Sequence, residues 1–272
     1  MKVRFLGTAA FEGIPALFCR CSLCLKAREH GGKDIRTRTS VLLDDDLKID
    51  FPPDTLHHMH RDNLDLEQVQ DLLLTHSHSD HLYAEDLAAR LPGYAQSESH
   101  TIRLYGNGNV IAGCKQSLDR EGGARDKFEL IEVKPFERIE MRTAIAVALP
   151  AAHDPAEDCL LYCIEKDGKS VLYGHDSGLF PEETWQWLKS ARIDLAILEC
   201  TMGHAEYHKT HMNIDAVLHT RERLLEYGTI SADGRIVVTH FSHNAGLTHD
   251  DLVRTFAPYN IETAFDGMTI EI

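Results

Sequence analysis

The stretch THSHSDHLYAED (residues 75–86) places three histidines and an aspartate within six positions, as His76, His78, Asp80 and His81. It follows the apolar run DLLL, which predicts a buried strand. In an extended turn, residues two apart point the same way, so His76 and His78 can hold one metal ion. Asp80 and His81 then turn toward a neighbouring position. Because imidazole and carboxylate suit zinc, manganese or iron, this spacing predicts a metal site at the end of the strand.

Three more candidate ligands occur where other predicted strands end. His153 follows AVALPAA, Asp176 follows SVLYGH, and His240 follows RIVVT. Side chains from the ends of several strands can converge at one edge of a sheet, where a rigid scaffold holds them. Together with the histidine-rich stretch they complete a site for two metal ions. An aspartate is the natural bridge, because one carboxylate can contact both ions.

The motif THSHSDH, with later His, Asp and His at strand ends, resembles the metallo-β-lactamase superfamily. The resemblance implies an αββα fold with a dinuclear site between two sheets, holding two zinc or manganese ions. By position, the implied ligands are His76, His78 and His153 for one metal and Asp80, His81 and His240 for the other, with Asp176 as the bridge. Redox members that carry di-iron resemble a variant with Glu at position 78, so hydrolysis is favoured over electron transfer. The superfamily cleaves lactams, thioesters and phosphodiesters, so the motif does not select a substrate.

A second motif, FCRCSLC, contains Cys19, Cys21 and Cys24 in a C-x-C-x2-C spacing. In a reducing compartment, three thiols this close are well placed to bind zinc, and one more ligand would close a tetrahedron. His243, three residues after His240, is the best candidate for that ligand. Such a closed site has no open position for water, so the zinc would be structural. The remaining cysteines are expected in the core: Cys114, Cys159, Cys163 and Cys200.

The chain also resembles the phosphodiesterases of the carbon–phosphorus lyase pathway, which open the five-membered ring of phosphoribosyl 1,2-cyclic phosphate. The resemblance is carried by GTAAFEGIPALFCRCSLC, THSHSDH, LPAAHD, YGHDSGLF, THMNIDAVL, VVTHFSH and AFDGMTIEI. It runs nearly end to end, which implies a single hydrolase domain over residues 1–272. It also places His211 near the phosphate as a non-ligand histidine, either a general acid or a phosphate binder, with His208 as the alternative. The proteins of pyrroloquinoline quinone biosynthesis share a similar cysteine motif, so the subfamily stays open.

The expected reaction is hydrolysis of a small phosphodiester, linear or cyclic, by a hydroxide that bridges the two metals. Two metals a few ångströms apart lower the pKa of the bridging water and hold the phosphoryl oxygens. Asp80 and His211 are the expected catalytic residues. Asp50 is expected to orient a metal ligand through a hydrogen bond to its imidazole.

Four alternatives stay open. A thioesterase or lactonase would use the same metals without a phosphate-binding histidine. A β-lactamase is disfavoured because the N-terminus lacks the apolar core of a signal peptide. A nuclease that processes the 3′ end of transfer RNA would need a basic arm. The non-enzymatic alternative is a metal-binding protein related to the pyrroloquinoline quinone biosynthesis family, which would bind zinc without turnover.

The composition of the chain limits the kinds of molecule that the protein is expected to bind. The chain has 272 residues, 43% of them hydrophobic, and a net charge of −15, which disfavours binding to nucleic acid. No apolar run approaches the ~20 residues of a membrane span. We therefore expect a cytoplasmic protein whose partner is a small phosphodiester, with no membrane attachment; the chain could form a homodimer.

The pattern of apolar runs predicts a mixed α/β fold. Strands are expected over residues 2–7, 39–43, 47–50, 71–76, 102–106, 144–153, 159–165, 170–176, 194–200 and 235–241. Helices are expected over 84–91, 181–191, 213–227 and 248–257, and KDGK (166–169) is typical of a hairpin turn. Strands covered by helices in this order predict a four-layer αββα sandwich of two mixed sheets.

One segment departs from the family pattern. IDFPPDTLHHMHRDNLD (49–65) replaces the short glycine turn that is common after the third strand of the family. It contains His57, His58 and His60. We expect a solvated, histidine-rich loop here rather than a further metal site.

Overall fold

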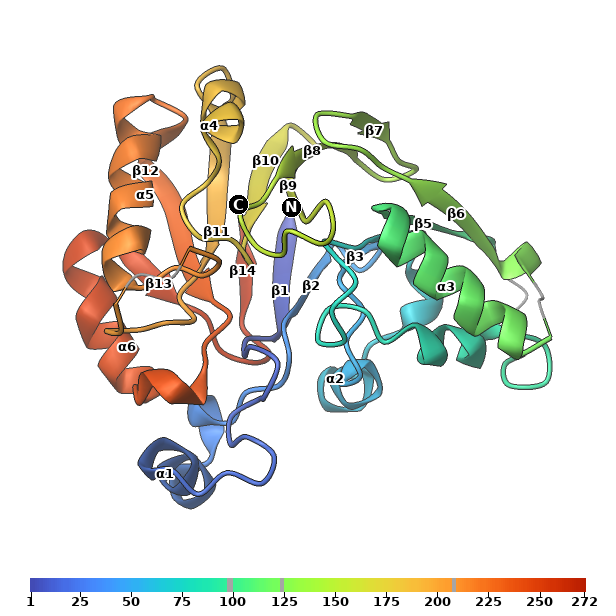
Figure 1. Ribbon diagram of the computed structural model, residues 1–272, viewed down its shortest axis with the longest axis horizontal. Helices are drawn as coiled ribbons and strands as arrows, with labels where there is room; N and C mark the ends of the chain where they lie inside the picture. Colours follow the sequence, from blue (N-terminus) through green and yellow to red (C-terminus); the bar gives the residue numbers. More distant parts are fainter. Residues whose placement is uncertain (97–99, 123–124, 207–208) are drawn as a thin grey trace.

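The computed structural model describes residues 1–96, 100–122, 125–206 and 209–272. Its centre is a pair of sheets that face each other (Figure 1). The first sheet consists, in spatial order, of β14 (Thr269–Glu271), β1 (Lys2–Gly7), β2 (Ser40–Leu43), β3 (Leu47–Ile49), β4 (Asp71–Leu73), β5 (Ile102–Gly106) and β6 (Phe128–Glu132). The second consists of β13 (Ile261–Thr263), β12 (Ile230–Thr239), β11 (Ile193–Glu199), β10 (Lys169–Gly174), β9 (Leu160–Lys166), β8 (Ile145–Pro150) and β7 (Arg138–Glu140).

Both sheets are mixed and share one pattern of pairing. From β14 to β3 each neighbouring pair is antiparallel, and from β3 to β6 each pair is parallel. From β7 to β10 the pairs are likewise antiparallel, and from β10 to β13 they are parallel. The carboxyl ends of the parallel strands in each sheet therefore lie at one edge, where ligand sites of α/β sheets form.

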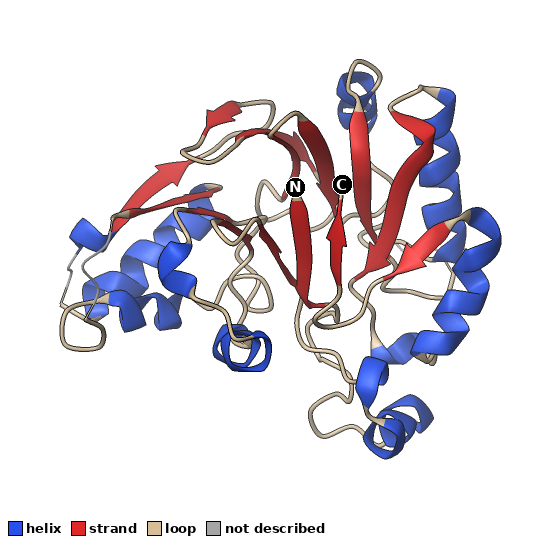
Figure 2. Cartoon of the chain, turned by 180° about the vertical axis from the view of Figure 1, so that it is seen from behind, coloured by secondary structure: helices blue, strands red, loops and turns tan. Residues whose placement is uncertain are grey.

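Helices cover the two outer faces of the sheets (Figure 2). The 3₁₀ helix η3 (Ala84–Arg90) and α3 (Gly108–Arg120) pack on the first sheet, while α4 (Glu182–Leu188), α5 (Ile214–Glu226) and α6 (His249–Phe256) pack on the second. A separate apolar cluster, which includes Phe5, Leu47, Tyr162 and Val237, fills the space between the sheets. The predicted four-layer αββα arrangement of two mixed sheets is confirmed.

Most of the expected elements are present. All ten predicted strands form, and the predicted hairpin joins β9 to β10, with Asp167 (φ +52°) and Gly168 (φ +71°) in the left-handed conformation that a tight hairpin turn requires. Helix α5 begins after Asn213, whose side chain accepts a hydrogen bond from the Ala216 N–H. Cys114, Cys159, Cys163 and Cys200 are buried, as expected of core residues.

Two predicted segments differ from expectation. Within the expected helix 84–91, the segment Ala84–Arg90 forms a 3₁₀ helix rather than an α-helix, and its buried side chains pack against α3. The segment expected to be a solvated histidine-rich loop instead contains helix α2 (Thr55–Asp62). Within it His57 and His60 are exposed, but His58 is buried and its Nε2 lies 2.7 Å from the Thr37 hydroxyl. The contact of His58 with Thr37, which lies earlier in the chain, therefore holds this segment against the rest of the protein.

Further elements in the described residues had no clear sequence signal. They are α1 (Ser22–His30), η1 (Gly32–Asp34), η2 (Leu66–Gln68), η4 (Arg125–Lys127), η5 (His243–Ala245) and η6 (Ala257–Tyr259), together with α3 and the edge strands β6, β7, β13 and β14. Among the described helices, none is long and apolar enough to cross a membrane.

Candidate metal centre

The predicted ligands converge where strands of both sheets end. His76, His78, Asp80 and His81 follow β4, and His153 follows β8. Asp176 follows β10, and His240 follows β12. Asp176 (φ +55°) and His240 (φ +56°) have left-handed backbone, as does Asp50 (φ +59°) after β3. Strained backbone of this kind persists where the surrounding structure holds it, and it is frequent at functional sites.

The first group contains His76, His78 and His153, whose ring nitrogens lie within 4.8 Å of one another. Nδ1 of His78 is 3.2 Å from Nε2 of His153. The ring of His76 packs edge-on against both, with centroids 4.5 Å from His78 and 4.9 Å from His153. Three imidazoles arranged around one point can hold a divalent metal and leave a position open.

The second group contains Asp80, His81, Asp176 and His240, all buried, with ligand atoms that also lie within 4.8 Å of one another. Nε2 of His81 is 2.7 Å from Oδ2 of Asp176 and 3.3 Å from Oδ2 of Asp80. Nε2 of His240 is 3.1 Å from Oδ1 of Asp176. Oxygen and nitrogen donors in this number suit zinc or manganese.

Asp176 lies between the two groups. Its Oδ2 is 3.4 Å from Nε2 of His76 and 3.9 Å from Nε2 of His153, both in the first group, besides its contact with His81 in the second. The Asp176 carboxylate therefore lies within 4 Å of histidines from both groups.

In each histidine of the two groups, the ring nitrogen that faces away from the cluster lies within hydrogen-bonding distance of an oxygen atom. The pairs are His76 Nδ1 with the Thr75 hydroxyl (3.0 Å), His78 Nε2 with Asp154 (3.1 Å), His81 Nδ1 with Asp50 (2.7 Å), His153 Nδ1 with the Thr210 carbonyl (3.2 Å) and His240 Nδ1 with the Thr201 hydroxyl (2.8 Å). Such partners orient the rings and direct the opposite nitrogen at a metal. The expectation that Asp50 orients a ligand agrees with its contact to His81.

The charges of the cluster fit bound cations. Burial lowers the pKa of His76 well below its ordinary value, so its imidazole is neutral and offers a lone pair. Burial opposes charge on His81 too, yet Asp176, Asp80 and Asp50 raise its pKa well above the ordinary value. In the described residues, Nε2 of His76 is buried without a hydrogen bond, and Nε2 of His240 and Oδ1 of Asp176, although 3.1 Å apart, are not aligned for one. Buried polar atoms left without partners, beside an excess of carboxylate, are satisfied by metal ions.

His211, the expected phosphate-binding or general-acid histidine, lies beside this cluster and has a partner that the sequence did not reveal. Its Nδ1 is 2.9 Å from Oε1 of Glu199, a fully buried carboxylate at the end of β11. Glu199 is fixed by the backbone N–H groups of Ser177 (3.0 Å) and Thr201 (3.2 Å). Burial lowers the pKa of His211, but the charge and hydrogen bond of Glu199 outweigh it and raise that pKa to about 9.

Glu199 had a signal that could have revealed it. It ends an apolar strand, DLAILE, as the other site residues do. Asp154 and Glu157, which lie close to His78, were also missed. His208, the alternative to His211, lies outside the described residues. His175 is buried with its ring 5.6 Å from that of His240, and it belongs to none of the candidate metal groups among the described residues.

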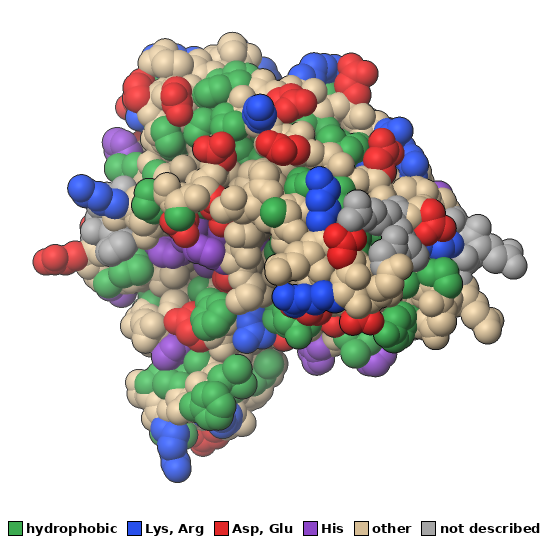
Figure 3. Space-filling model, turned by 45° about the vertical axis from the view of Figure 1, so that its right-hand side comes forward, with side chains coloured by type: hydrophobic (Ala, Val, Ile, Leu, Met, Phe, Trp, Pro, Cys, Tyr) green, Lys and Arg blue, Asp and Glu red, His purple; other side chains and the backbone are tan. Residues whose placement is uncertain are grey.

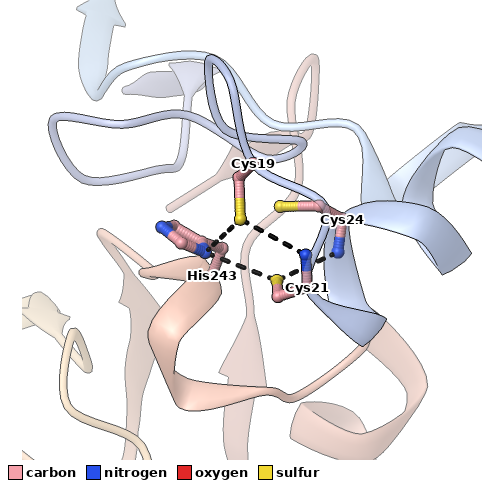
Figure 4. Close-up of side chains that lie close together, drawn as sticks. All are labelled: Cys19, Cys21, Cys24 and His243. Atoms are coloured by element: carbon pink, nitrogen blue, oxygen red, sulfur yellow. Dashed lines mark hydrogen bonds between the residues drawn. The ribbon is translucent and has the colours of Figure 1, made fainter.

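The cysteine motif forms a separate group with His243 (Figure 4). Nδ1 of His243 is 3.5 Å from the sulfur of Cys19 and 3.5 Å from that of Cys21, and Cys24 completes a set within 4.8 Å. Burial raises the pKa of Cys21, but the Cys24 N–H and His243 lower it to about 6. Three sulfurs and one nitrogen around a point match the donor set of a structural zinc.

A cavity of about 630 Å³ opens onto the histidine–aspartate cluster. Figure 3 shows histidine side chains gathered in a hollow of the surface. The side chains that line it include His78, Asp80, His153, Asp176, His211 and His240 of this region, together with Phe11, Glu12, Ser242 and Asn244. A cavity of this size admits a small organic substrate.

The chain belongs to the β-lactamase superfamily, because the family model of the beta-lactamase superfamily domain matches residues 49–249. With the two sheets and the metal-ligand clusters described above, it is a member with the metallo-β-lactamase fold and a metal-dependent hydrolase of that class. Among curated proteins, none matches the chain.

Several solved structures share the fold over the whole chain. A diphosphatase from the PhnP family is 24% identical, with a TM-score of 0.75 over 100% of this chain and 98% of that one. Zinc-bound PqqB from Methylobacterium extorquens is 18% identical, with a TM-score of 0.76 over 100% of both chains. Human tRNase Z, short form, is 17% identical, with a TM-score of 0.71 over 100% of this chain and 99% of that one.

Proposed function

We propose that this protein is a dinuclear-metal phosphodiesterase that hydrolyses a small phosphodiester, linear or cyclic. One observation carries the proposal: His211, paired with buried Glu199, lines the cavity beside the metal-ligand cluster. A histidine held in its charged form suits a phosphoryl oxygen or a departing alkoxide. A thioesterase or a lactonase has no need of such a group. The similarity of the chain to a diphosphatase from the PhnP family supports hydrolysis at a phosphoryl group rather than at a thioester or a lactone.

We assign the two groups of ligands to two divalent ions, zinc or manganese. His76, His78 and His153 would hold one ion, and Asp80, His81 and His240 would hold the other, with Asp176 between them. When bound, the two ions supply Lewis acidity toward the phosphoryl oxygens and lower the pKa of water.

The protein's own side chains would then position the reactants and move protons. Nδ1 of His211 is occupied by Glu199, so its Nε2–H is the atom available to the cavity. From there it would donate to a phosphoryl oxygen or protonate the leaving oxygen. Asp80 also lines the cavity, where its carboxylate would accept a hydrogen bond from the attacking water.

A third ion would serve the fold. We assign a structural zinc to Cys19, Cys21, Cys24 and His243. Three thiolate ligands are kept reduced most readily in the cytoplasm, which is the location we propose.

Initial rates on a small panel of substrates test the proposal. The protein is reconstituted with zinc or with manganese and offered an aryl phosphodiester, a five-membered cyclic phosphate, an aryl phosphomonoester, a thioester and a lactam. We expect turnover of the diesters alone. Preferential turnover of the thioester would contradict the proposal, and silence on every compound with metals bound would favour a metal-binding protein without catalysis.

A further inference from the structure

A single carboxylate holds Ser77, the residue between the first two histidines of the metal-ligand stretch. Glu157 accepts from the Ser77 N–H at both oxygens (3.2 Å at Oε1 and 3.1 Å at Oε2) and from the Ser77 hydroxyl at Oε1 (2.8 Å). The two residues are 80 positions apart in the sequence. Glu157 is half-buried and does not line the cavity that opens onto the histidine–aspartate cluster. It therefore acts on the backbone that carries the ligands and not on a molecule in the cavity.

Helix α3 fixes the other side of this carboxylate. Nδ2 of Asn107 donates to Oε2 of Glu157 (2.8 Å) and to the Asp158 carbonyl (2.9 Å). Oδ1 of the same amide accepts from the Val110 N–H (3.0 Å) as the N-cap of α3. Because the cap engages the amide oxygen, the amide NH2 faces Glu157. The surroundings of Glu157 thus consist of donors and match a carboxylate, whereas a glutamine would place its own NH2 group against one of them.

Glu157 joins the two segments that carry the first group of candidate ligands. His76 and His78 are the neighbours of Ser77 in the sequence. His153 lies four positions before Glu157, in the second segment. Nδ1 of His78 is 3.2 Å from Nε2 of His153, so a small shift between the segments changes the space that a metal ion would fill. Metal sites tolerate little displacement of their ligands, so a contact that fixes the two segments affects metal binding.

The second group of ligands does not depend on this contact. Its histidines His81 and His240 have outer contacts of their own, with Asp50 and Thr201 respectively. Among the described residues, the hydrogen bonds of the Glu157 carboxylate reach no member of that group. Both oxygens of the carboxylate are engaged by donors, which favours a role in orientation over a role as a metal ligand. Its loss should therefore weaken one metal position and spare the other.

We propose that Glu157 is a positioning residue for the metal ion assigned to His76, His78 and His153. By fixing the distance between the two segments that carry these histidines, its carboxylate sets the affinity of this position for a divalent ion. Loss of an outer partner of a metal site typically weakens metal binding by about 10- to 100-fold. The inference rests on the proposed function, because it takes the three histidines to hold one of the two catalytic ions.

Equilibrium dialysis against manganese tests the inference without requiring turnover. A chelator first removes all metal. Because thiolates disfavour manganese, the manganese that binds afterwards reports on the histidine–aspartate cluster. We expect the wild-type protein to bind two manganese ions. Glu157→Gln should bind one ion with unchanged affinity and the other about tenfold more weakly or worse. At a manganese concentration that fills both positions in the wild-type protein, the electron paramagnetic resonance spectrum should change from that of a coupled pair to that of an isolated ion.

Asp158→Asn provides the matched control in the same loop. The Asp158 side chain is exposed, and its residue contacts Asn107 through the backbone carbonyl, which the substitution keeps. This variant should bind both ions as the wild-type protein does. Equal weakening in Asp158→Asn would assign the effect to the loss of a negative charge and overturn the inference. Two unchanged affinities in Glu157→Gln would overturn it as well.

Ser77→Ala decides the question if Glu157→Gln fails to fold. It removes only the hydroxyl contact (2.8 Å) and keeps the contacts of the Ser77 N–H with Glu157. We expect it to weaken the same metal position by about threefold to tenfold, the effect of one hydrogen bond. An unchanged affinity in this variant would contradict the inference.

Hydrolysis of an aryl phosphodiester, measured in parallel, separates the inference from the proposed function. Excess manganese should restore the rate of Glu157→Gln, because the variant has lost occupancy of one metal position and no group that touches the substrate. Turnover by a Glu157→Gln protein whose two affinities equal those of the wild type refutes the inference alone. Selective weakening of one ion in a protein that hydrolyses no diester refutes the proposed function alone.

Discussion

At the scale of single residues, an oxygen atom outside the cluster contacts one ring nitrogen of each candidate ligand histidine, and the other ring nitrogen faces the cluster. Thr75, for example, donates its hydroxyl to Asp50 (3.0 Å) while lying 3.0 Å from Nδ1 of His76. The hydroxyl is thereby available as an acceptor for the Nδ1–H of His76, which leaves Nε2 without a proton and directed at the cluster. Tautomer and orientation are set together, before any metal binds.

Substitutions in the two metal groups should have different consequences. Asp80→Ala or His76→Ala should abolish hydrolysis while the protein stays folded, because the catalytic groups lie at the edge of the sheets. Cys21→Ser or His243→Ala should lower the thermal midpoint and the zinc content, because binding of a structural zinc contributes folding free energy. Rates, thermal unfolding and metal analysis on the four variants check this. Equal midpoints in all four would refute the division into two sites.

Glu199 should act through His211. In Glu199→Gln the amide oxygen can replace only one of the two carboxylate oxygens, which accept from the Ser177 N–H (Oε1) and the Thr201 N–H (Oε2), and the charge that stabilises imidazolium is lost. We expect kcat for a diester to fall about 100-fold with KM little changed, the usual size of a general-acid contribution.

A double variant tests whether Glu199 affects catalysis only through His211. If Glu199 works only through His211, then Glu199→Gln combined with His211→Ala should be no slower than His211→Ala alone. Additive losses would instead assign Glu199 an independent role.

At the scale of the elements, β3 carries a buried lysine beneath the site. Lys48 donates to the Ser40 hydroxyl and to the Asp50 carbonyl (2.6 Å), at the residue whose left-handed backbone aims a carboxylate at His81. Burial lowers the pKa of Lys48 to about 7, against the attraction of Asp50. This contact connects the core of the first sheet to a ligand histidine.

The lowered pKa predicts how stability depends on pH. Between about pH 7 and 10 the unfolded chain keeps a proton on Lys48 that the folded chain has lost, so the contribution of this residue to the free energy of unfolding rises with pH. Relative to Lys48→Met, the wild-type protein should gain roughly 2 kcal/mol between pH 7 and 9. Denaturant unfolding of both proteins at the two pH values measures this. Lys26 is exposed, so Lys26→Met should show no such change with pH. If the difference in unfolding free energy between the wild-type protein and Lys48→Met is the same at both pH values, Lys48 is not held neutral.

At the scale of the whole molecule, the histidine–aspartate cluster and the cysteine group share one segment. His240 and His243, three residues apart after β12, belong to the first and to the second respectively. The N-terminal segment is thereby joined to the end of the second sheet, and the Ala10 N–H also donates to the Phe241 carbonyl (3.0 Å). That residues 1–272 form a single domain stays a prediction.

Removing the metal ions and adding them back should distinguish the histidine–aspartate cluster from the cysteine group. A strong chelator should abolish activity and lower the thermal midpoint by about 5 °C or more, since the cysteine group then loses its zinc. Manganese alone should restore hydrolysis but not the full midpoint, because thiolates select zinc over manganese. Zinc should restore both hydrolysis and the full thermal midpoint. Full recovery of the midpoint with manganese would show that the cysteine group does not hold a zinc that stabilises the fold.

Local patterns were sufficient to predict much of this protein. The histidine-rich stretch, the strand-end positions of His153, Asp176 and His240, and the alternation of strands and helices all depend on neighbours in the sequence. For this reason the four-layer fold and the convergence of these side chains were predictable. The cysteine group could be predicted for the same reason, since its spacing is itself the signal.

Only the tertiary structure revealed the residues that surround these ligands. Glu199 and Asp154 look like ordinary acidic residues in the sequence, and each contacts a histidine of the site that lies 12 or 76 positions away. Helix α2 likewise forms where a solvated loop was expected, with His58 buried against Thr37. The physical reason is the same in each case: hydrogen bonds and burial depend on distance in space, whereas periodicity and spacing report only distance along the chain.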